Sequence, residues 1–467
     1  IDGNGVRDVG GAAGWGDDAP GFGEPIFVPD DVDRDGLLEP AERVIQLGTS
    51  KVRALFLALP SGATGVTMRG AGLADVARDY THGFAGYADT LHATGVAGIL
   101  VGDVPLIGRR FVGVAPDADL VVAARYGGPA DADLVWALSQ APDVVVDETG
   151  AWADVLLDGG GAYSAMIDAS VDTVAHVCIA GNTGGTGKHA SAVLAPGETR
   201  DMSFRQLARR LVVSIHVPVG ADVRVVLVEP SGVEHDHAAG ESVLSTGERL
   251  QTWELASDRA FDVRSFAFQL ATTTPLPSTP WVVRVRGEPS SAVTVHGFIR
   301  DERVWSRSSA WITPDETSTF TSPGTSDGCL AVGAVTGHDA TEGPWFEPLG
   351  RERPGSIRLY SSRGPRINGG HTIGVVGPDN PWCPLGAGDV YPGMPGSFVA
   401  PEGAFHILGG TSSSTPHVAG AAALLAQAGI HGRDAIAAIT GSAIADVITG
   451  AVPNDDYGHG RLDIAGA

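Results

Sequence analysis

The chain has 467 residues, enough for two or three domains and too many for one compact core. Acidic residues outnumber basic ones 55 to 31, and the net charge of −24 repels nucleic acid and anionic membranes, so we expect neither as a partner. Such a surface suits a secreted or cell-surface protein, or a salty environment. No stretch of the sequence has the apolar length of a membrane span.

The two ends of the compositional argument are the N-terminus and the cysteines. The sequence begins abruptly at Ile1–Asp2 without a recognisable signal peptide, so we expect a processed or truncated N-terminus. The three cysteines, Cys178, Cys329 and Cys383, lack metal-like spacing and allow at most one disulfide.

Residues 1–48 are rich in Gly, Asp and Pro and contain one short helical pattern near 40–47. From 51 to about 190, continuous apolar runs alternate with helical patterns, as in a parallel sheet covered on both faces. The predicted strands are 51–59, 118–126, 142–148 and 175–182, and the predicted helices are 131–141 and 162–174. This rhythm predicts an α/β fold with a doubly wound parallel sheet.

The rhythm changes near residue 191, where short β-like runs separated by Gly, Pro and Ser turns begin. They predict an inserted, jelly-roll-like β-sandwich. Strand-like sequence resumes at 329–337, and 416–429 predicts a helix. The expected segments are an N-terminal acidic segment at 1–48, an α/β core at 49–190 and 318–467, and the inserted sandwich at 191–317.

Residues 409–420, GGTSSSTPHVAG, resemble the nucleophile motif of the subtilisin (subtilase, peptidase S8) family, Gly-Thr-Ser-x-x-x-Pro-His-Val-Ala-Gly. The resemblance places the nucleophile at Ser412 and puts Ser413 and Ser414 on variable positions. Ser412 also stands where a loop enters a helix, so its oxygen faces the free N–H groups of the helix terminus. Serine and threonine clusters before helices are often only N-caps, but a match of this length favours the nucleophile.

Two further segments supply partners for Ser412. Residues 91–102, LHATGVAGILVG, resemble the family's histidine motif and place the general base at His92, although Ala93 and Gly95 depart from it. His82 fits the downstream spacing less well. The segment VCIAGN resembles the family's oxyanion motif and implies that Asn182 donates to the oxyanion. Further similarity at 113–128, 322–333, 360–365 and 457–463 extends the resemblance over about 51–190 and 318–467.

The resemblance implies a serine endopeptidase that cuts protein or peptide substrates through an acyl-enzyme. Two alternatives stay open: a catalytically inactive binding or scaffold protein with the same fold, and a peptide ligase or macrocyclase that uses the same site.

The acid of the triad is missing from its usual place. Subtilases carry an aspartate at the end of the first core strand, and here Pro60 aligns with it. Glu148 follows a neighbouring strand and is the best replacement, giving a Ser412–His92–Glu148 triad. Strand alternation sends Asp147 to the opposite face, so only one of the two carboxylates can face the histidine.

Three other readings of the acid remain. Asp2 lies in a sequence like the family's aspartate motif but lacks a supporting strand. A degenerate, inactive site is another. Glu148 could instead line the first specificity pocket and select a basic substrate side chain.

The segment DVDRDGLLEPAE, residues 31–42, has the spacing of an EF-hand-like calcium loop. Asp31, Asp33, Asp35 and Glu42 would supply carboxylates and Leu37 its carbonyl, with an exiting helix after residue 38. Because no entering helix is visible, we expect a single structural Ca²⁺ site rather than a sensor.

Overall fold

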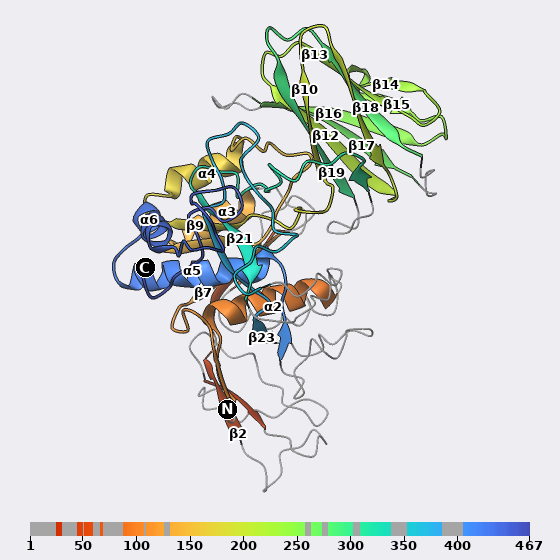
Figure 1. The fold of residues 1–467 in the computed structure, drawn as a ribbon. Helices are drawn as coiled ribbons and strands as arrows, with labels where there is room; N and C mark the ends of the chain where they lie inside the picture. The colour runs from red at the N-terminus through yellow and green to blue at the C-terminus, as the bar shows by residue number, and fades with distance from the viewer. Residues whose placement is uncertain are drawn as a thin grey trace, which may run out of the picture.

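The computed structural model describes residues 25–29, 44–49, 51–58, 66–68, 87–106, 109–125, 131–256, 263–272, 279–301, 309–337, 353–384 and 405–467. Within them, helices and strands alternate in the first and last parts of the chain. Between them, residues 189–301 are built from strands and one short 3-10 helix. Figure 1 shows the strand-rich region at one end and the first two strands at the other, with the α/β part between them.

The centre of the α/β part is a four-stranded parallel sheet. Its strands are β8 (Val144–Asp147), β9 (Ala175–Ile179), β21 (Cys329–Thr336) and β22 (Val375–Asp379), in the order β22-β21-β9-β8. Every residue of β9 and β21 is buried, as expected for parallel strands covered on both faces. The carboxyl ends of β8, β9 and β22 therefore lie along one edge.

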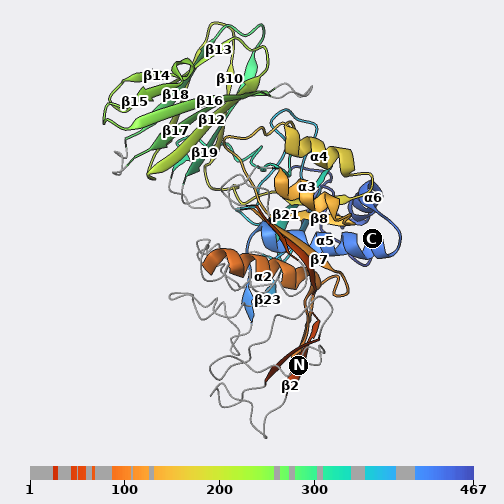
Figure 2. The ribbon, with the colours of Figure 1, turned by 180° about the vertical axis from the view of Figure 1, so that it is seen from behind.

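Helices cover both faces of this sheet (Figures 1 and 2). On one face, α5 (Thr411–Gln427) and α6 (Gly432–Ser442) pack against alternate strand residues such as Val177. On the other face, α3 (Ala132–Ser139) and α4 (Ala162–Ser170) enclose a cluster that includes Cys178. Adjacent residues of β9 thus point to opposite helical layers, which is the two-residue period of a strand.

A second, smaller sheet continues the α/β part. It pairs β3 (Val52–Ala58) in parallel with β7 (Leu120–Arg125), and antiparallel with β4 (Val66–Met68). Helix α2 (Tyr87–Val101) packs against α5, and β5 (Asp103–Leu106) and β6 (Arg109–Val112) form a hairpin. Phe56 of β3 stacks on Trp136 of α3 with ring centroids 5.2 Å apart, which joins this sheet to the central layer.

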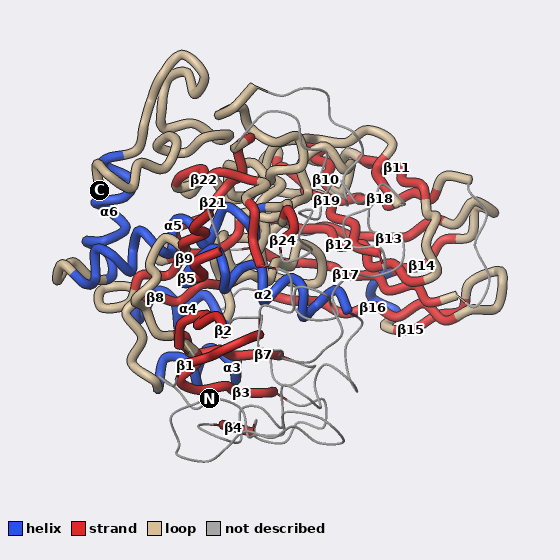
Figure 3. The backbone as a smooth tube through the Cα atoms, turned by 90° about the horizontal axis from the view of Figure 1, so that it is seen from below, coloured by secondary structure: helices blue, strands red, loops and turns tan. Residues whose placement is uncertain are grey.

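Residues 189–311 form two antiparallel sheets with a common apolar core. The six-stranded sheet contains β10 (His189–Leu194), β19 (Val293–Asp301), β12 (Arg210–Pro218), β17 (Val263–Ala271), β16 (Arg249–Ala256) and β15 (Glu241–Val243). The five-stranded sheet contains β14 (Glu234–Asp236), β13 (Val223–Val228), β18 (Trp281–Gly287), β11 (Thr199–Arg205) and β20 (Ala310–Trp311). The helix η2 (His237–Ala239) follows β14. The tube drawing shows these strands as one block beside the helices (Figure 3).

The two-sheet region is docked on the α/β part through buried contacts. Trp152, Leu157 and Phe298 share an apolar cluster, and the Trp152 indole donates a 2.7 Å hydrogen bond to the carbonyl of Ile299. Arg300 and Asp154 form an ion pair across the same junction at 2.8 Å. The junction is therefore packed and polar-matched rather than a loose linker.

The order of strands and helices predicted for 131–182, 329–337 and 416–429 is confirmed. The helix predicted near 40–47 is wrong: β2 (Val44–Thr49) is a strand that pairs antiparallel with β1 (Pro25–Pro29). Pairing with Ile26–Val28 satisfies the β2 backbone, and the β-branched and apolar residues of Val44–Leu47 suit a strand, so tertiary context overrides the local helical pattern. A short hairpin of β23 (Trp382–Pro384) and β24 (Phe405–Ile407) precedes α5.

Candidate active site

Ser412 lies in the first turn of α5, immediately after Gly410 and Thr411. Its side chain is 6% exposed, whereas Thr411, Ser413, Ser414 and Thr415 are 0% exposed. Gly410 has φ 111°, a conformation that favours glycine, and it produces the sharp entry into the helix. The prediction that Ser412 stands where a loop enters a helix is confirmed, and of the serine triplet it alone reaches a surface.

Asn182 is held by the residue that precedes Ser412. The backbone N–H of Thr411 donates to Asn182 Oδ1 at 2.9 Å, and the Thr411 hydroxyl lies 3.0 Å from the same oxygen. Because a backbone N–H can only donate, these contacts fix which end of the amide is oxygen. Asn182 Nδ2 therefore faces away from Thr411, and it has no hydrogen bond to a described residue.

Two unpartnered donors thus accompany Ser412. One is Asn182 Nδ2, and the other is the backbone N–H of Ser412, which has no acceptor among the described residues. Gly410 keeps the space beside Nδ2 open, since a Cβ there would lie 3.1 Å from that nitrogen. Donors left free at the start of a helix, beside a hydroxyl, form the arrangement that stabilises an oxyanion.

His92 lies on α2, one turn before Val96 and two turns before Ile99 on the same face. Val96 and Ile99 pack with Leu408, which is four residues from Ser412. Helix α2 itself packs against α5, and the His92 side chain is partly buried. The face of α2 that carries His92 is therefore the face turned toward the start of α5.

Glu148 lies directly after β8 with both carboxylate oxygens buried and without a hydrogen-bond partner among the described residues. Burial raises its pKa well above the usual value; the Ser412 hydroxyl opposes that rise, and the charge of Asp147 adds to it. Ser412 is thus the polar side chain beside the carboxyl, but their contact falls short of an aligned hydrogen bond. The expected bond between Glu148 and His92 is not formed in this structure.

Asp147 faces the other side of β8. Its Oδ1 accepts hydrogen bonds from the backbone N–H of Thr149 at 3.0 Å and from the Thr149 hydroxyl at 2.7 Å. Its Oδ2 accepts from Tyr163 of α4. The two neighbouring carboxylates therefore point in opposite directions, as strand alternation predicts.

Several sequence-based candidates lie outside the described residues: Asp2, Pro60, His82 and the loop from Asp31 to Glu42. The exiting helix expected after that loop is wrong from Val44 onward, where β2 begins. Cys178 and Cys329 form a disulfide between β9 and β21, consistent with the limit of one bridge, and Cys383 is free and buried. Among the described residues, no group of His, Cys, Asp or Glu side chains is arranged to hold a metal ion.

Sequence reasoning missed the polar cluster behind the nucleophile. Ser413 Oγ lies 2.7 Å from Asp379 Oδ1, so this serine is an anchor of the turn although it falls on a variable motif position. Asp379 ends β22 in the sequence VVGPDN, which reads as an ordinary turn. A signal existed only in the apolar run that precedes this aspartate.

Comparisons with known proteins bear on these observations. The sequence model of the subtilase family, Peptidase S8, matches residues 306–460, a segment that includes Ser412 and Asp379 but not His92, Glu148 or Asn182. No curated protein sequence gives a significant match.

Solved structures share the fold. The CspB protease of Clostridium perfringens is 18% identical with a TM-score of 0.66, over 89% of this chain and 86% of that chain. The epidermin leader peptide processing protease EpiP of Staphylococcus aureus is 14% identical with a TM-score of 0.35, over 80% of this chain and 62% of its own. The patellamide maturation protease PatG is 13% identical with a TM-score of 0.38, over 89% and 83%.

Only the first of these structures is close enough to bear on the fold, and it agrees with an α/β core of the subtilisin type. The family match covers the segment with the nucleophile motif, and the nucleophile's surroundings were described above without it. The resemblance seen in the sequence is thereby confirmed, and the chain is a subtilisin-like serine protease.

Proposed function

We propose that this protein is a serine endopeptidase that hydrolyses peptide bonds through an acyl-enzyme. In the first step, Ser412 Oγ attacks the peptide carbonyl and its proton passes to His92. The protonated His92 then gives that proton to the leaving amine, and the acyl-enzyme remains. Water attacks the ester in the second step, with His92 again as base, and restores Ser412.

The observation that carries this proposal is the pair of unpartnered donors beside the accessible serine. Asn182 Nδ2 and the Ser412 backbone N–H are held before substrate arrives, because Thr411 fixes the amide and α5 fixes the backbone. Donors that need no reorganisation stabilise the tetrahedral oxyanion by about 3 to 4 kcal/mol. A merely structural serine at a helix start would not require them to stay free.

The third member of the proposed triad is Glu148, completing Ser412–His92–Glu148. Its support is a buried carboxyl next to Ser412 that makes no hydrogen bond with the described residues. Such groups are rare in native proteins and concentrate at functional sites. The proposal requires the Glu148 side chain to rotate so that its carboxylate accepts the second ring N–H of His92.

Peptide hydrolysis tests the proposal directly. The wild-type chain and Ser412→Ala are incubated with an unstructured protein and with a mixture of peptides, and the products are weighed by mass spectrometry. We expect new N-termini and an added water for each cut in the wild type, and none with Ser412→Ala. Cyclic or joined products lacking that water would assign a ligase or macrocyclase, and unchanged substrate would favour the inactive binding protein.

The two antiparallel sheets extend the proposal to the architecture. We propose that 191–317 is a β-sandwich domain inserted in a subtilisin-like core formed by 49–190 and 318–467, after an N-terminal segment at 1–48. Its support is the separate apolar core of the two sheets. No described helix is long and apolar enough to cross a membrane. We propose a secreted or cell-surface location, as the acidic composition suggests.

Calcium is a separate proposal that rests on the sequence alone. The oxygen donors of Asp31, Asp33, Asp35, Leu37 and Glu42 are of the hard type that Ca²⁺ prefers. Bound there, the ion would stiffen the N-terminal segment and take no part in the chemistry. If the site exists, a chelator lowers the unfolding temperature and Ca²⁺ restores it, and Asp33→Asn weakens both effects.

A further inference from the structure

A buried polar cluster lies directly behind the nucleophile turn. Asp379 at the end of β22, Arg358 and Tyr360 are each at most 4% exposed. Arg358 Nε lies 2.8 Å from Asp379 Oδ2, and because its N–H is not aligned with that oxygen the contact is an ion pair rather than a hydrogen bond. The Tyr360 hydroxyl donates to the same oxygen. One Asp379 oxygen is thus occupied by Arg358 and Tyr360.

The other oxygen holds the turn that carries the nucleophile. The backbone N–H of Gly410 donates to Asp379 Oδ1 at 3.0 Å and also lies 3.1 Å from the Tyr360 hydroxyl. Ser413 Oγ lies 2.7 Å from Asp379 Oδ1. Gly410 and Ser413 flank Thr411 and Ser412, so the cluster grips the chain on both sides of the nucleophile.

We propose that Asp379 is a positioning residue of the active site, which fixes Gly410 and Ser413 and thereby aligns the Ser412 hydroxyl and its backbone N–H with Asn182. This inference rests on the proposed function, since it concerns the alignment of that site. Asp379 touches no reacting atom in this scheme. Its contribution is the geometry of the serine and the oxyanion donors.

Close docking of β22 on α5 supports this role. A Cβ at Gly377 would lie 2.7 Å from the Ser414 carbonyl oxygen, so only glycine allows the strand to approach the helix so closely. The Ser414 hydroxyl donates to the carbonyl of Pro378 at 3.2 Å. The strand that ends in Asp379 is therefore joined to the nucleophile helix by several independent contacts.

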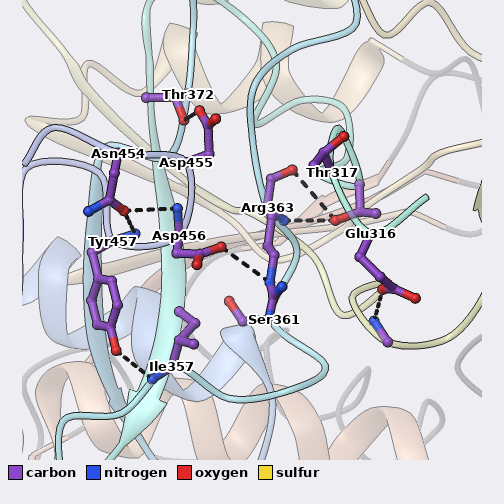
Figure 4. A network of polar contacts seen from close by, with 12 residues as sticks. Glu316, Thr317, Ile357, Ser361, Arg363, Thr372, Asn454, Asp455, Asp456 and Tyr457 are labelled. Atoms are coloured by element: carbon purple, nitrogen blue, oxygen red, sulfur yellow. Dashed lines mark hydrogen bonds and ion pairs between the residues drawn. The ribbon is translucent and has the colours of Figure 1, made fainter. Parts of the chain in front are cut away.

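The loop that carries Arg358 and Tyr360 is anchored in turn by the C-terminal segment (Figure 4). The backbone N–H of Ile357 donates to the Tyr457 hydroxyl at 3.0 Å, and Arg363 pairs with Asp456 at 3.3 Å. Asp456 is exposed, so its ion pair adds little to stability. It offers a matched control: an Arg-paired aspartate in the same scaffold that does not touch the nucleophile turn.

The network's rigidity has a direct consequence for rate. Misplacing reacting groups by about 1 Å costs roughly 100-fold in rate, because near-attack geometry is lost. Asp379→Asn keeps an acceptor for Gly410 and Ser413 but removes the charge that pairs with Arg358. Ser413→Ala removes one grip and leaves the charge pair in place.

The experiment compares Asp379→Asn, Ser413→Ala and Asp456→Asn with the wild-type chain, in buffer where urea titration shows each to be folded. The readouts are kcat, KM and amide hydrogen exchange over residues 408–416. We expect kcat to fall about 10- to 100-fold in Asp379→Asn and less in Ser413→Ala, with KM changed little. Amide exchange over the turn should be faster in both variants and unchanged in Asp456→Asn.

Unchanged kcat and unchanged turn exchange in folded Asp379→Asn would overturn the inference. If that variant does not fold, Ser413→Ala decides by the same two readouts. If the wild-type chain cleaves nothing, the proposed function fails, while the exchange data still decide whether Asp379 holds the turn.

Discussion

The nucleophile turn and the Glu148 carboxyl lie next to each other, yet they differ in how their polar groups are satisfied. In the turn, Thr411 binds Asn182, and Ser413 and Gly410 bind Asp379. At Glu148, both oxygens are buried and neither has a hydrogen-bond partner among the described residues.

The difference separates positioning from chemistry. Burying a polar group without a partner costs about 1 to 3 kcal/mol, so a fold keeps such a group only where it is useful. Fully bonded groups hold geometry, whereas an unbonded carboxyl beside a nucleophile is available to a second group or to substrate. On this account the turn is a rigid support, and Glu148 is a reactive member of the site.

Replacing Glu148 by Gln gives the largest effect among the tests of this comparison. We expect kcat to fall by about 10³- to 10⁴-fold, since an amide cannot stabilise the imidazolium as a carboxylate does. Stability should stay the same or rise, because an unpartnered buried carboxyl is removed. Steady-state kinetics and urea unfolding measure the two quantities.

Two controls accompany that variant. Asp147→Asn removes the neighbouring carboxylate on the opposite face, and Asp2→Asn removes the alternative acid; we expect neither to reduce kcat by more than a few fold. Near-normal turnover of Glu148→Gln would refute the relocated acid. A loss confined to substrates with a basic side chain at the cleavage site would assign Glu148 to specificity instead.

Asn182→Ala tests the rigid side of the comparison. Loss of one oxyanion donor should lower kcat by about 10²- to 10³-fold with little change in KM. Thr411→Val removes the hydroxyl contact to Asn182 Oδ1 but keeps the backbone N–H contact, so its effect should be only a few fold. Equal effects of the two variants would contradict the assignment of Asn182 as the donor.

His216 sharpens the comparison because it is also buried with an unpartnered nitrogen, yet it lies in the strand-rich region away from Ser412. Burial lowers the pKa of His216 to about 3, and the nearby His296 and His189 lower it further. Burial likewise lowers the pKa of His296 to about 4. His216 therefore tests whether an unpartnered buried group matters for function or only for stability.

The sign of its pH effect follows from these shifts. An unfolded histidine takes up a proton below about pH 6.5, whereas these two stay neutral in the native state until about pH 4 or lower. Stability is therefore complete above pH 6.5 and falls as the pH drops from there toward 4. The expected loss by pH 4.5 is about 2 kcal/mol for each histidine.

Urea unfolding at a series of pH values measures that loss. His216→Gln should flatten the dependence by about one proton and leave kcat at pH 7.5 unchanged. An unaltered slope would contradict the assigned pKa, and a large fall in kcat would show that an unpartnered nitrogen far from Ser412 also serves catalysis.

The sequence predicted local features well. The apolar runs of 142–148 and 175–182 became β8 and β9, and strand alternation correctly separated Asp147 from Glu148. The motif that starts at Gly409 placed Ser412 at a helix start. Each of these depends on neighbours in the chain, which periodicity records.

Contacts between distant segments were not predictable in the same way. Asp379, Arg358 and Ser413 meet only because β22, a loop and α5 converge, and one sequence carries no trace of that convergence. The helix expected near 40–47 failed for the same reason, because pairing of β2 with β1 decides the conformation there. The position of the triad acid also depends on tertiary geometry, so spacing left Glu148 and Asp2 both open.

Site-specific labelling by a fluorophosphonate is the most direct test of the central claim that Ser412 is the nucleophile of a working site. The folded wild-type chain is treated with the reagent, digested and mapped by tandem mass spectrometry. The account predicts one adduct on Ser412 that is absent in Ser412→Ala and retained, at a lower rate, in Ser413→Ala. Absence of labelling in the folded wild-type chain, or an adduct on Ser413, would contradict it.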